Sequence, residues 1–122
     1  MSDKWTAQKI KHFKGKGRLA ALTAHDYTLA RLIDAAGIPI ILVGDSLGMY
    51  AQGNDTTLPV TMDQMVYHTT LVARGATHDV VIADMPFLSY QINREEAFRN
   101  AGRFIQESGA DAVKIEGGAI RA

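Results

Sequence analysis

Apolar runs alternate with amphipathic segments along most of the chain. Continuous apolar runs predict strands at residues 18–24, 38–43, 80–83 and 112–115. Apolar residues at helical spacing predict helices at residues 26–37, 63–76 and 94–108. The run at residues 38–43 is unbroken, which is typical of a strand buried on both faces. The Gly/Asn/Thr/Pro-rich segment from Asp45 to Thr61 is predicted as a long loop.

Three strand–helix units followed by a fourth strand imply a parallel sheet with right-handed crossovers. Such a sheet is either doubly wound or part of a (β/α)₈ barrel, and a barrel takes about 250 residues. The 122 residues of this chain could therefore hold only half of one. We expect a single domain over residues 1–122, with an N-terminal helix and lead-in at about residues 1–17. Open edges on the first and fourth strands would favour self-association.

Composition and charge narrow the range of partners. The chain is 47% hydrophobic and 21% charged, with 13 Lys+Arg against 13 Asp+Glu, so we expect no nucleic-acid or membrane partner. It contains no cysteine, which excludes disulfides and thiolate metal sites. The basic start lacks an apolar signal region, and no apolar stretch has the length of a membrane span. We therefore expect a soluble, cytoplasmic protein.

Three carboxylates follow successive predicted strands. Asp45, Asp84 and Glu116 each come at or just after an apolar run, and the carboxyl ends of parallel strands lie on one side of a sheet. Converging carboxylate oxygens are suitable ligands for Mg²⁺. The alternative is that each acid caps the next helix, which is how we interpret Asp26. A long loop after Asp45 and Pro86 after Asp84 favour the metal interpretation.

Lys114 and Glu116 lie two residues apart on the fourth predicted strand and so share one face, with Val113 and Ile115 on the other. The charged pair is predicted to face inward. It is either a plain ion pair or a cation for an anionic substrate beside a metal ligand. The histidines His25, His68 and His78 lack the spacing of a zinc site and are predicted to be structural or solvated.

Two short motifs have competing interpretations. Residues 44–48 (GDSLG) match the G-x-S-x-G pattern of serine hydrolases, but the predicted loop after them and the lack of a histidine after Asp84 argue against a GDSL-type or related hydrolase. Residues 15–20 (GKGRLA) match G-x-G-x-x-A, but they precede the first strand instead of linking a strand to a helix. Neither motif is assigned a function.

Seven ordered blocks together resemble the ketopantoate hydroxymethyltransferase family. They are residues 23–27 (TAHDY), 43–49 (VGDSLGM), 57–61 (TLPVT), 67–68 (YH), 74–75 (RG), 84–90 (DMPFLSY) and 114–118 (KIEGG). The resemblance runs from Lys16 to Gly118, which is nearly the whole chain. It implies a (β/α)₈ TIM barrel of which this chain supplies about the first four strands.

The resemblance also implies a reaction and a site. The family transfers a hydroxymethyl group from 5,10-methylenetetrahydrofolate to 3-methyl-2-oxobutanoate, giving 2-dehydropantoate for pantothenate biosynthesis, through a Mg²⁺-stabilised enolate. Asp45 and Asp84 would bind Mg²⁺ and Glu116 would complete the metal's surroundings. The oxo acid would be held by Ser46 and Lys114 beside Asp45 and Asp84. The general base is a glutamate beyond the end of this chain, so the chain itself contains no catalytic residue. The family forms symmetric oligomers, so we also expect a homo-oligomer.

Two positions depart from the family pattern: His25 stands where Tyr is frequent, and Leu88 where Gly is frequent. Both leave the metal ligands untouched and concern the shape of the pocket. Two other functions stay open. One is another Mg²⁺-dependent enolate enzyme of the phosphoenolpyruvate mutase and isocitrate lyase group, against which the TLPVT and KIEGG blocks argue. The other is a non-catalytic, metal-binding half-barrel.

Overall fold

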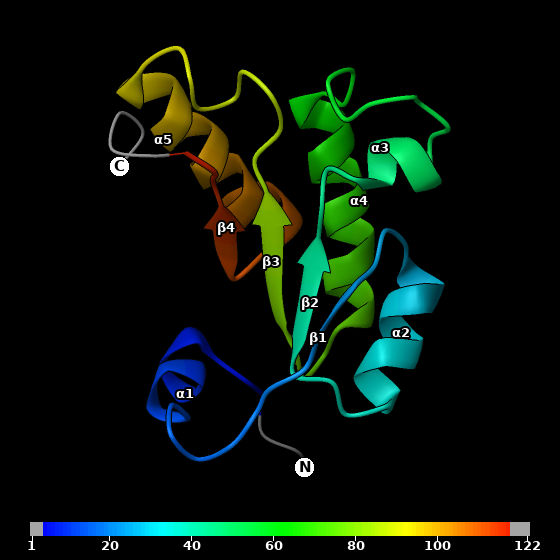
Figure 1. Cartoon of the computed structure of the whole chain (residues 1–122), viewed down its shortest axis with the longest axis vertical. Coiled ribbons are helices and arrows are strands. Elements are labelled where there is room, and N and C mark those ends of the chain that lie inside the picture. Colours follow the sequence, from blue (N-terminus) through cyan, green and yellow to red (C-terminus); the bar gives the residue numbers. More distant parts are fainter. Residues whose placement is uncertain (1–3, 118–122) are drawn as a thin grey trace.

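The computed structural model describes residues 4–117. Its centre is a four-stranded parallel sheet whose strands follow the chain in the order β1-β2-β3-β4. The strands are β1 (Ala21–Thr23), β2 (Ile40–Val43), β3 (Val80–Asp84) and β4 (Ala112–Lys114). The arrows of β2, β3 and β4 point the same way in Figure 1. The prediction of four parallel strands is confirmed.

The outer strands are shorter than their apolar runs predicted. β1 pairs with β2 only from Ala21 opposite Ile40 to Thr23 opposite Leu42, so residues 18–20 precede the strand. β4 ends at Lys114, the partner of Asp84, because β3 ends there as well. The limits of an edge strand are thus set by its neighbour, and an apolar run alone does not contain that information.

The predicted helices are present as α2 (Tyr27–Ala35), α4 (Met62–Gly75) and α5 (Arg94–Arg103), the last continuing as a π-helical segment, η1 (Phe104–Ser108). Asp26 caps α2 as predicted, because its carboxylate accepts a hydrogen bond from the backbone N–H of Leu29 at 2.8 Å. Helix α1 (Ala7–His12) lies within the predicted lead-in, whose residues 1–3 are outside the described part of the chain. Within residues 4–117, no helix is long and apolar enough to cross a membrane.

The prediction of an unbroken loop over residues 45–61 is wrong at its start, where helix α3 (Leu47–Tyr50) lies. Leu47 is fully buried, and Gly48 lies so close to Val60 that a Cβ atom at Gly48 would collide with it. The short helix therefore forms because its apolar side packs back on the end of the same segment. Because α3 follows Ser46 directly, the predicted loop no longer argues against a serine hydrolase.

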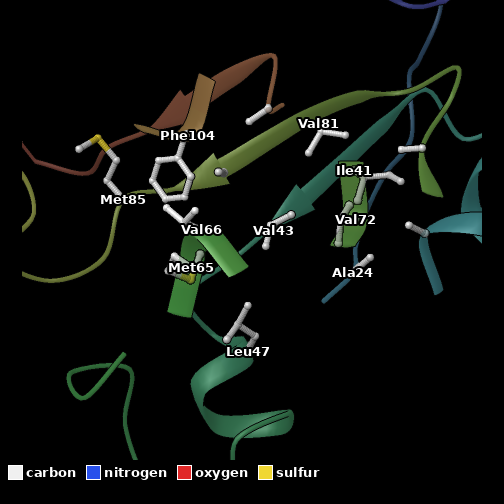
Figure 2. Packing of buried hydrophobic residues seen from close by; sticks show 14 of the residues in the cluster. Ala24, Ile41, Val43, Leu47, Met65, Val66, Val72, Val81, Met85 and Phe104 are labelled. Atoms are coloured by element: carbon white, nitrogen blue, oxygen red, sulfur yellow. The ribbon is translucent and has the colours of Figure 1, made fainter. Parts of the chain in front are cut away.

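The hydrophobic core fills one side of the sheet. Ile41 and Val81 are registered partners, as are Val43 and Ala83, and all four are fully or almost fully buried. Helix α4 packs against β2, β3, η1 and α2, and Figure 2 shows Phe104 from η1 beside Val66 from α4. A Cβ atom on Gly75 would lie 2.7 Å from the backbone carbonyl oxygen of Tyr27 in α2. The close approach of α2 and α4 therefore requires glycine at the end of α4.

The other face of the sheet carries the alternate residues of each strand. Ile40 and Leu42 in β2 and Ile82 in β3 are half-buried, so the prediction that β2 is buried on both faces is wrong for its second face. The registered partners Asp84 and Lys114 continue this face at the carboxyl ends of β3 and β4. Two charged residues therefore stand at the edge of an otherwise apolar surface.

The amino ends of the strands meet helix α1 and the residues before it, at the opposite end from the strand arrowheads (Figure 1). The Nζ of Lys4 donates a hydrogen bond to the carbonyl oxygen of Asp79 at 2.6 Å, and the backbone N–H of Trp5 donates to that of His78 at 2.7 Å. The start of the described chain is thus attached directly before β3.

Candidate active site at the carboxyl ends of the strands

A pocket opens at the carboxyl ends of β3 and β4 and contains four of the five residues singled out from the sequence. Its lining consists of Asp45, Thr57, Leu58, Asp84, Met85, Phe87, Tyr90, Gln91, Lys114 and Glu116. The predicted convergence of the three carboxylates and the lysine at one end of the sheet is therefore present in the structure. Ser46 is not among the lining residues.

Asp84 is the buried member of the group. Its Oδ2 accepts a hydrogen bond from the backbone N–H of Asp45 at 3.1 Å, and its Oδ1 is buried without a hydrogen-bond donor. Gly44 makes this approach possible, because a Cβ atom there would lie only 3.3 Å from Asp84 Oδ2. The nearest cation is the Nζ of Lys114, at 3.4 Å from Oδ1. A buried carboxylate oxygen that makes no hydrogen bond and has one distant ion-pair partner would be stabilised by a further cation.

Lys114 lies between two carboxylates. Its Nζ is 2.8 Å from Oε1 of Glu116 and 3.4 Å from Oδ1 of Asp84. The hydrogen bond to Glu116 raises the pKa of Lys114 above its ordinary value, and the charge of Asp84 adds to this effect. The same hydrogen bond lowers the pKa of Glu116, whose side chain is exposed. Both groups are thus held in their charged forms.

The ionised form of Asp45 is destabilised by its position near two other carboxylates. Burial raises its pKa, and the negative charges of Asp84 and Glu116 raise it further, while the charge of Lys114 and a backbone hydrogen bond act in the opposite direction without outweighing them. A carboxylate whose pKa is raised by burial and by like charges gains most from a nearby cation. Asp45 and Asp84 could therefore supply oxygen ligands and excess negative charge to a divalent ion.

The three carboxylates do not form a ready metal cage. Within residues 4–117, no group of three or more His, Asp or Glu side chains is arranged to hold an ion. Glu116 is directed to Lys114 and is bonded to it. Asp45 and Asp84 fit a hard cation that keeps several water or substrate ligands, as Mg²⁺ usually does, and Glu116 would act on it from a distance.

Tyr90 is a site residue that sequence reasoning did not single out. Its hydroxyl donates to the carbonyl oxygen of Glu116 at 3.0 Å and accepts from the backbone N–H of Glu116 at 3.2 Å. These bonds hold the chain just beyond β4, where no ladder partner follows. Tyr90 belongs to the DMPFLSY block, but nothing in that block alone indicated that its hydroxyl would reach Glu116.

The histidines take part in structural contacts. His68 Nδ1 lies 2.8 Å from the carbonyl oxygen of His25, and His78 Nδ1 lies 3.0 Å from Oδ2 of Asp34. The ring of His25 meets the ring of Tyr50 edge-on, with centroids 5.1 Å apart. None of the three lines the pocket, in agreement with the prediction that they are structural or solvated.

Residues 4–122 match the family model described as ketopantoate hydroxymethyltransferase. The chain belongs to that family. It is 55% identical over 116 residues to the 3-methyl-2-oxobutanoate hydroxymethyltransferase of Syntrophus aciditrophicus, covering 94% of this chain and 43% of that protein. It is 54% identical over 120 residues to the protein of that name from Desulforapulum autotrophicum, covering 98% and 46%. The chain thus spans less than half of the length of these relatives.

Solved structures confirm the barrel prediction. A phosphoenolpyruvate phosphomutase from Streptomyces platensis subsp. rosaceus superposes with a TM-score of 0.73 at 22% identity, covering 91% of this chain and 38% of that one. An oxaloacetate acetylhydrolase in complex with oxalate gives 0.70 at 18% identity, covering 94% and 40%. The chain has the fold of the first four strands of a (β/α)₈ barrel. At these identities the likeness concerns the fold alone.

Proposed function

We propose that the protein to which this chain belongs transfers a hydroxymethyl group to 3-methyl-2-oxobutanoate, with 5,10-methylenetetrahydrofolate as donor, in pantothenate biosynthesis. One observation supports this most directly: Asp45, Asp84, Lys114 and Glu116 line one pocket in a chain of the ketopantoate hydroxymethyltransferase family. The methylene carbon would form a bond to C3 of the oxo acid in place of the C3 proton, and both of its bonds to folate nitrogens would break, each nitrogen gaining a proton. Water would supply the hydroxyl group.

Asp45 and Asp84 would hold Mg²⁺ through their carboxylate oxygens. When bound, Mg²⁺ would supply Lewis-acid chemistry, withdrawing charge from the keto oxygen and so easing loss of the proton at C3. The buried Oδ1 of Asp84, whose one close cation among residues 4–117 is the 3.4 Å ion-pair partner Lys114, and the raised pKa of Asp45 both support a cation at this place. The proposal agrees with the hard-oxygen character of the ligands.

Lys114 would bind the carboxylate of the oxo acid. Its ammonium is held in the charged form between Glu116 and Asp84, so it is ready to pair with an anion. Tyr90 would keep this part of the site in place through its two bonds to the backbone of Glu116. Ser46 would also contact the oxo acid, as the family resemblance implies, although it is not among the residues that line the pocket. The general base would come from beyond residue 122.

The test uses the chain itself with Mg²⁺ and 3-methyl-2-oxobutanoate in D₂O, followed by NMR. We expect Mg²⁺-dependent binding of the oxo acid, weakened at least tenfold by Asp84→Asn, since a lost buried ligand costs about 1.4 kcal/mol or more. Asp63→Asn is the matched control, because the Asp63 side chain on α4 is 85% exposed and outside the pocket. Binding that ignores both Mg²⁺ and Asp84 would contradict the proposal.

The same spectra report exchange of the C3 proton with solvent. Binding without exchange is expected if the general base lies beyond residue 122. Exchange that disappears in Asp84→Asn would show instead that a base in this chain reaches C3. Both outcomes are compatible with the proposed substrate. Which of the two is observed shows whether the general base lies in this chain or beyond residue 122.

A further inference from the structure

The pocket has an apolar side to which the proposed chemistry gives no role. Leu58, from the segment after α3, and Phe87, from the segment after β3, line it together with the charged residues. Their exposed fractions are 59% and 50%. Exposed apolar side chains are ordinary when scattered, but two from separate segments in one concave site with a few convergent charges are typical of a small-molecule site.

Phe87 stands on a well-held segment. The carbonyl oxygen of Pro86 accepts hydrogen bonds from the backbone N–H of Ser89 at 3.0 Å and from the Ser89 hydroxyl at 2.6 Å. The Nδ2 of Asn100 in α5 donates to the carbonyl oxygen of Ser89 at 2.8 Å. This tight turn fixes the backbone beside Phe87, so less conformational freedom of this segment is lost when a ligand binds.

The backbone around Leu58 is held by the residues that flank it in the sequence. Its backbone N–H donates to the hydroxyl of Thr56 at 3.3 Å, and Val60, two residues later, is 3% exposed in the core against Gly48. The buried Val60 anchors the segment while Leu58 remains outside the core. Leu58 therefore does not contribute to the hydrophobic core of this chain, and core packing does not explain why a large apolar residue stands at position 58.

We infer that Leu58 and Phe87 form the wall that selects the alkyl side chain of the 2-oxo acid. The inference rests on the proposed function. The carboxylate and keto oxygens of the substrate belong on the side of Asp84 and Lys114, which leaves its alkyl group to the apolar side. Placing the alkyl group against the charged residues would remove water from them without compensation. A branched alkyl group covers the two side chains better than a methyl group does.

The test compares dissociation constants of 3-methyl-2-oxobutanoate and pyruvate, measured by NMR titration of the chain with Mg²⁺. The branched acid has two more carbons, and each buried carbon strengthens binding about fourfold, so the parent should prefer it by about 15-fold. Leu58→Ala and Phe87→Ala should each reduce this preference to about fivefold or less. Pyruvate should bind the variants as it binds the parent.

Two exposed residues elsewhere provide matched controls. Leu32→Ala on α2 and Phe98→Ala on α5 remove the same side chains where they are 64% and 80% exposed, and should leave the preference unchanged. An unchanged preference in both pocket variants, with both acids still bound, would overturn this inference and leave the proposed function intact. If the pocket variants bind both acids equally more weakly than the parent does, the inference is overturned too, because Leu58 and Phe87 would then contribute to binding without selecting the alkyl group. If the parent binds neither acid, the inference is overturned for this chain, whereas the proposed function concerns the longer protein to which the chain belongs and does not fall with it.

Discussion

Replacing Asp79 by asparagine should change how stability depends on pH. Asp79 is 1% exposed at the amino end of β3, and its Oδ2 has no hydrogen-bond partner. Burial raises its pKa to about 6, helped by the negative charge of Asp34. For Asp34, burial acts in the same direction, but hydrogen bonds from His78 and Thr77 outweigh it and lower its pKa. Asp79 is thus the member of the pair that holds a proton.

The magnitude follows from linkage. The folded-state pKa of about 6 lies above the ordinary value of 3.8, so the folded chain binds this proton more tightly than the unfolded chain does. The contribution to stability is complete below pH 3.8 and is lost as the pH rises through 6. Multiplying the 2.2-unit difference (6 − 3.8) by about 1.36 kcal/mol per unit gives about 3 kcal/mol as an upper figure.

Urea unfolding of the parent and of Asp79→Asn at pH 4 and at pH 7 measures this difference. Residue 79 of the variant cannot ionise, and part of the parent's contribution is already lost at pH 4, so the free energy of unfolding of the variant should rise relative to that of the parent by about 2.4 kcal/mol between the two pH values. Asp55→Asn, at an exposed position, controls for the removal of one carboxylate. A gap between parent and Asp79→Asn that is equal at both pH values would refute the reasoning.

Four further substitutions test the packing and the backbone. Phe104→Ala removes a fully buried ring and should cost about 3–5 kcal/mol in urea unfolding. Gly75→Ala places a Cβ 2.7 Å from the backbone of α2 and should cost about 1–3 kcal/mol, whereas Gly102→Ala on α5, where the Cβ meets nothing within 4 Å, should gain about 1 kcal/mol by the same assay. Leu88 has a φ of 69°, so Leu88→Gly should raise the thermal midpoint, with a gain of about 0.5–1 kcal/mol.

The strands and long helices could be predicted because each carries its own local signal, a continuous apolar run for a strand and apolar residues at helical spacing for a helix. The cap at Asp26 is likewise local, since one side chain satisfies a backbone N–H three residues away. Helix α3 could not be predicted, because its four residues are too few for a periodic pattern and its burial against Val60 depends on the folded segment. The end of β4 at Lys114 depends on where β3 ends. Such features arise only from contacts between elements.

The site residues at the ends of strands could be predicted from the sequence, whereas those in loops could not. Asp45, Asp84 and Lys114 could be predicted together because parallel strands bring their carboxyl ends to one side of the sheet. The bonds of Tyr90 to the backbone of Glu116 and the positions of Leu58 and Phe87 depend on the course of two loops. Loop residues follow no fixed period, so their direction toward or away from a pocket is not encoded in spacing.

The charges lining the pocket suggest an order of binding. Asp45, Asp84 and Glu116 give three negative charges and Lys114 one positive charge, a balance of −3 + 1 = −2 when all are ionised. An anionic oxo acid would meet net repulsion in such a pocket, and Lys114 alone is already shared by two carboxylates. A divalent cation would cancel the excess and leave Lys114 able to turn toward a substrate carboxylate. Metal binding before oxo acid binding is therefore the order that the electrostatics of these four side chains favour.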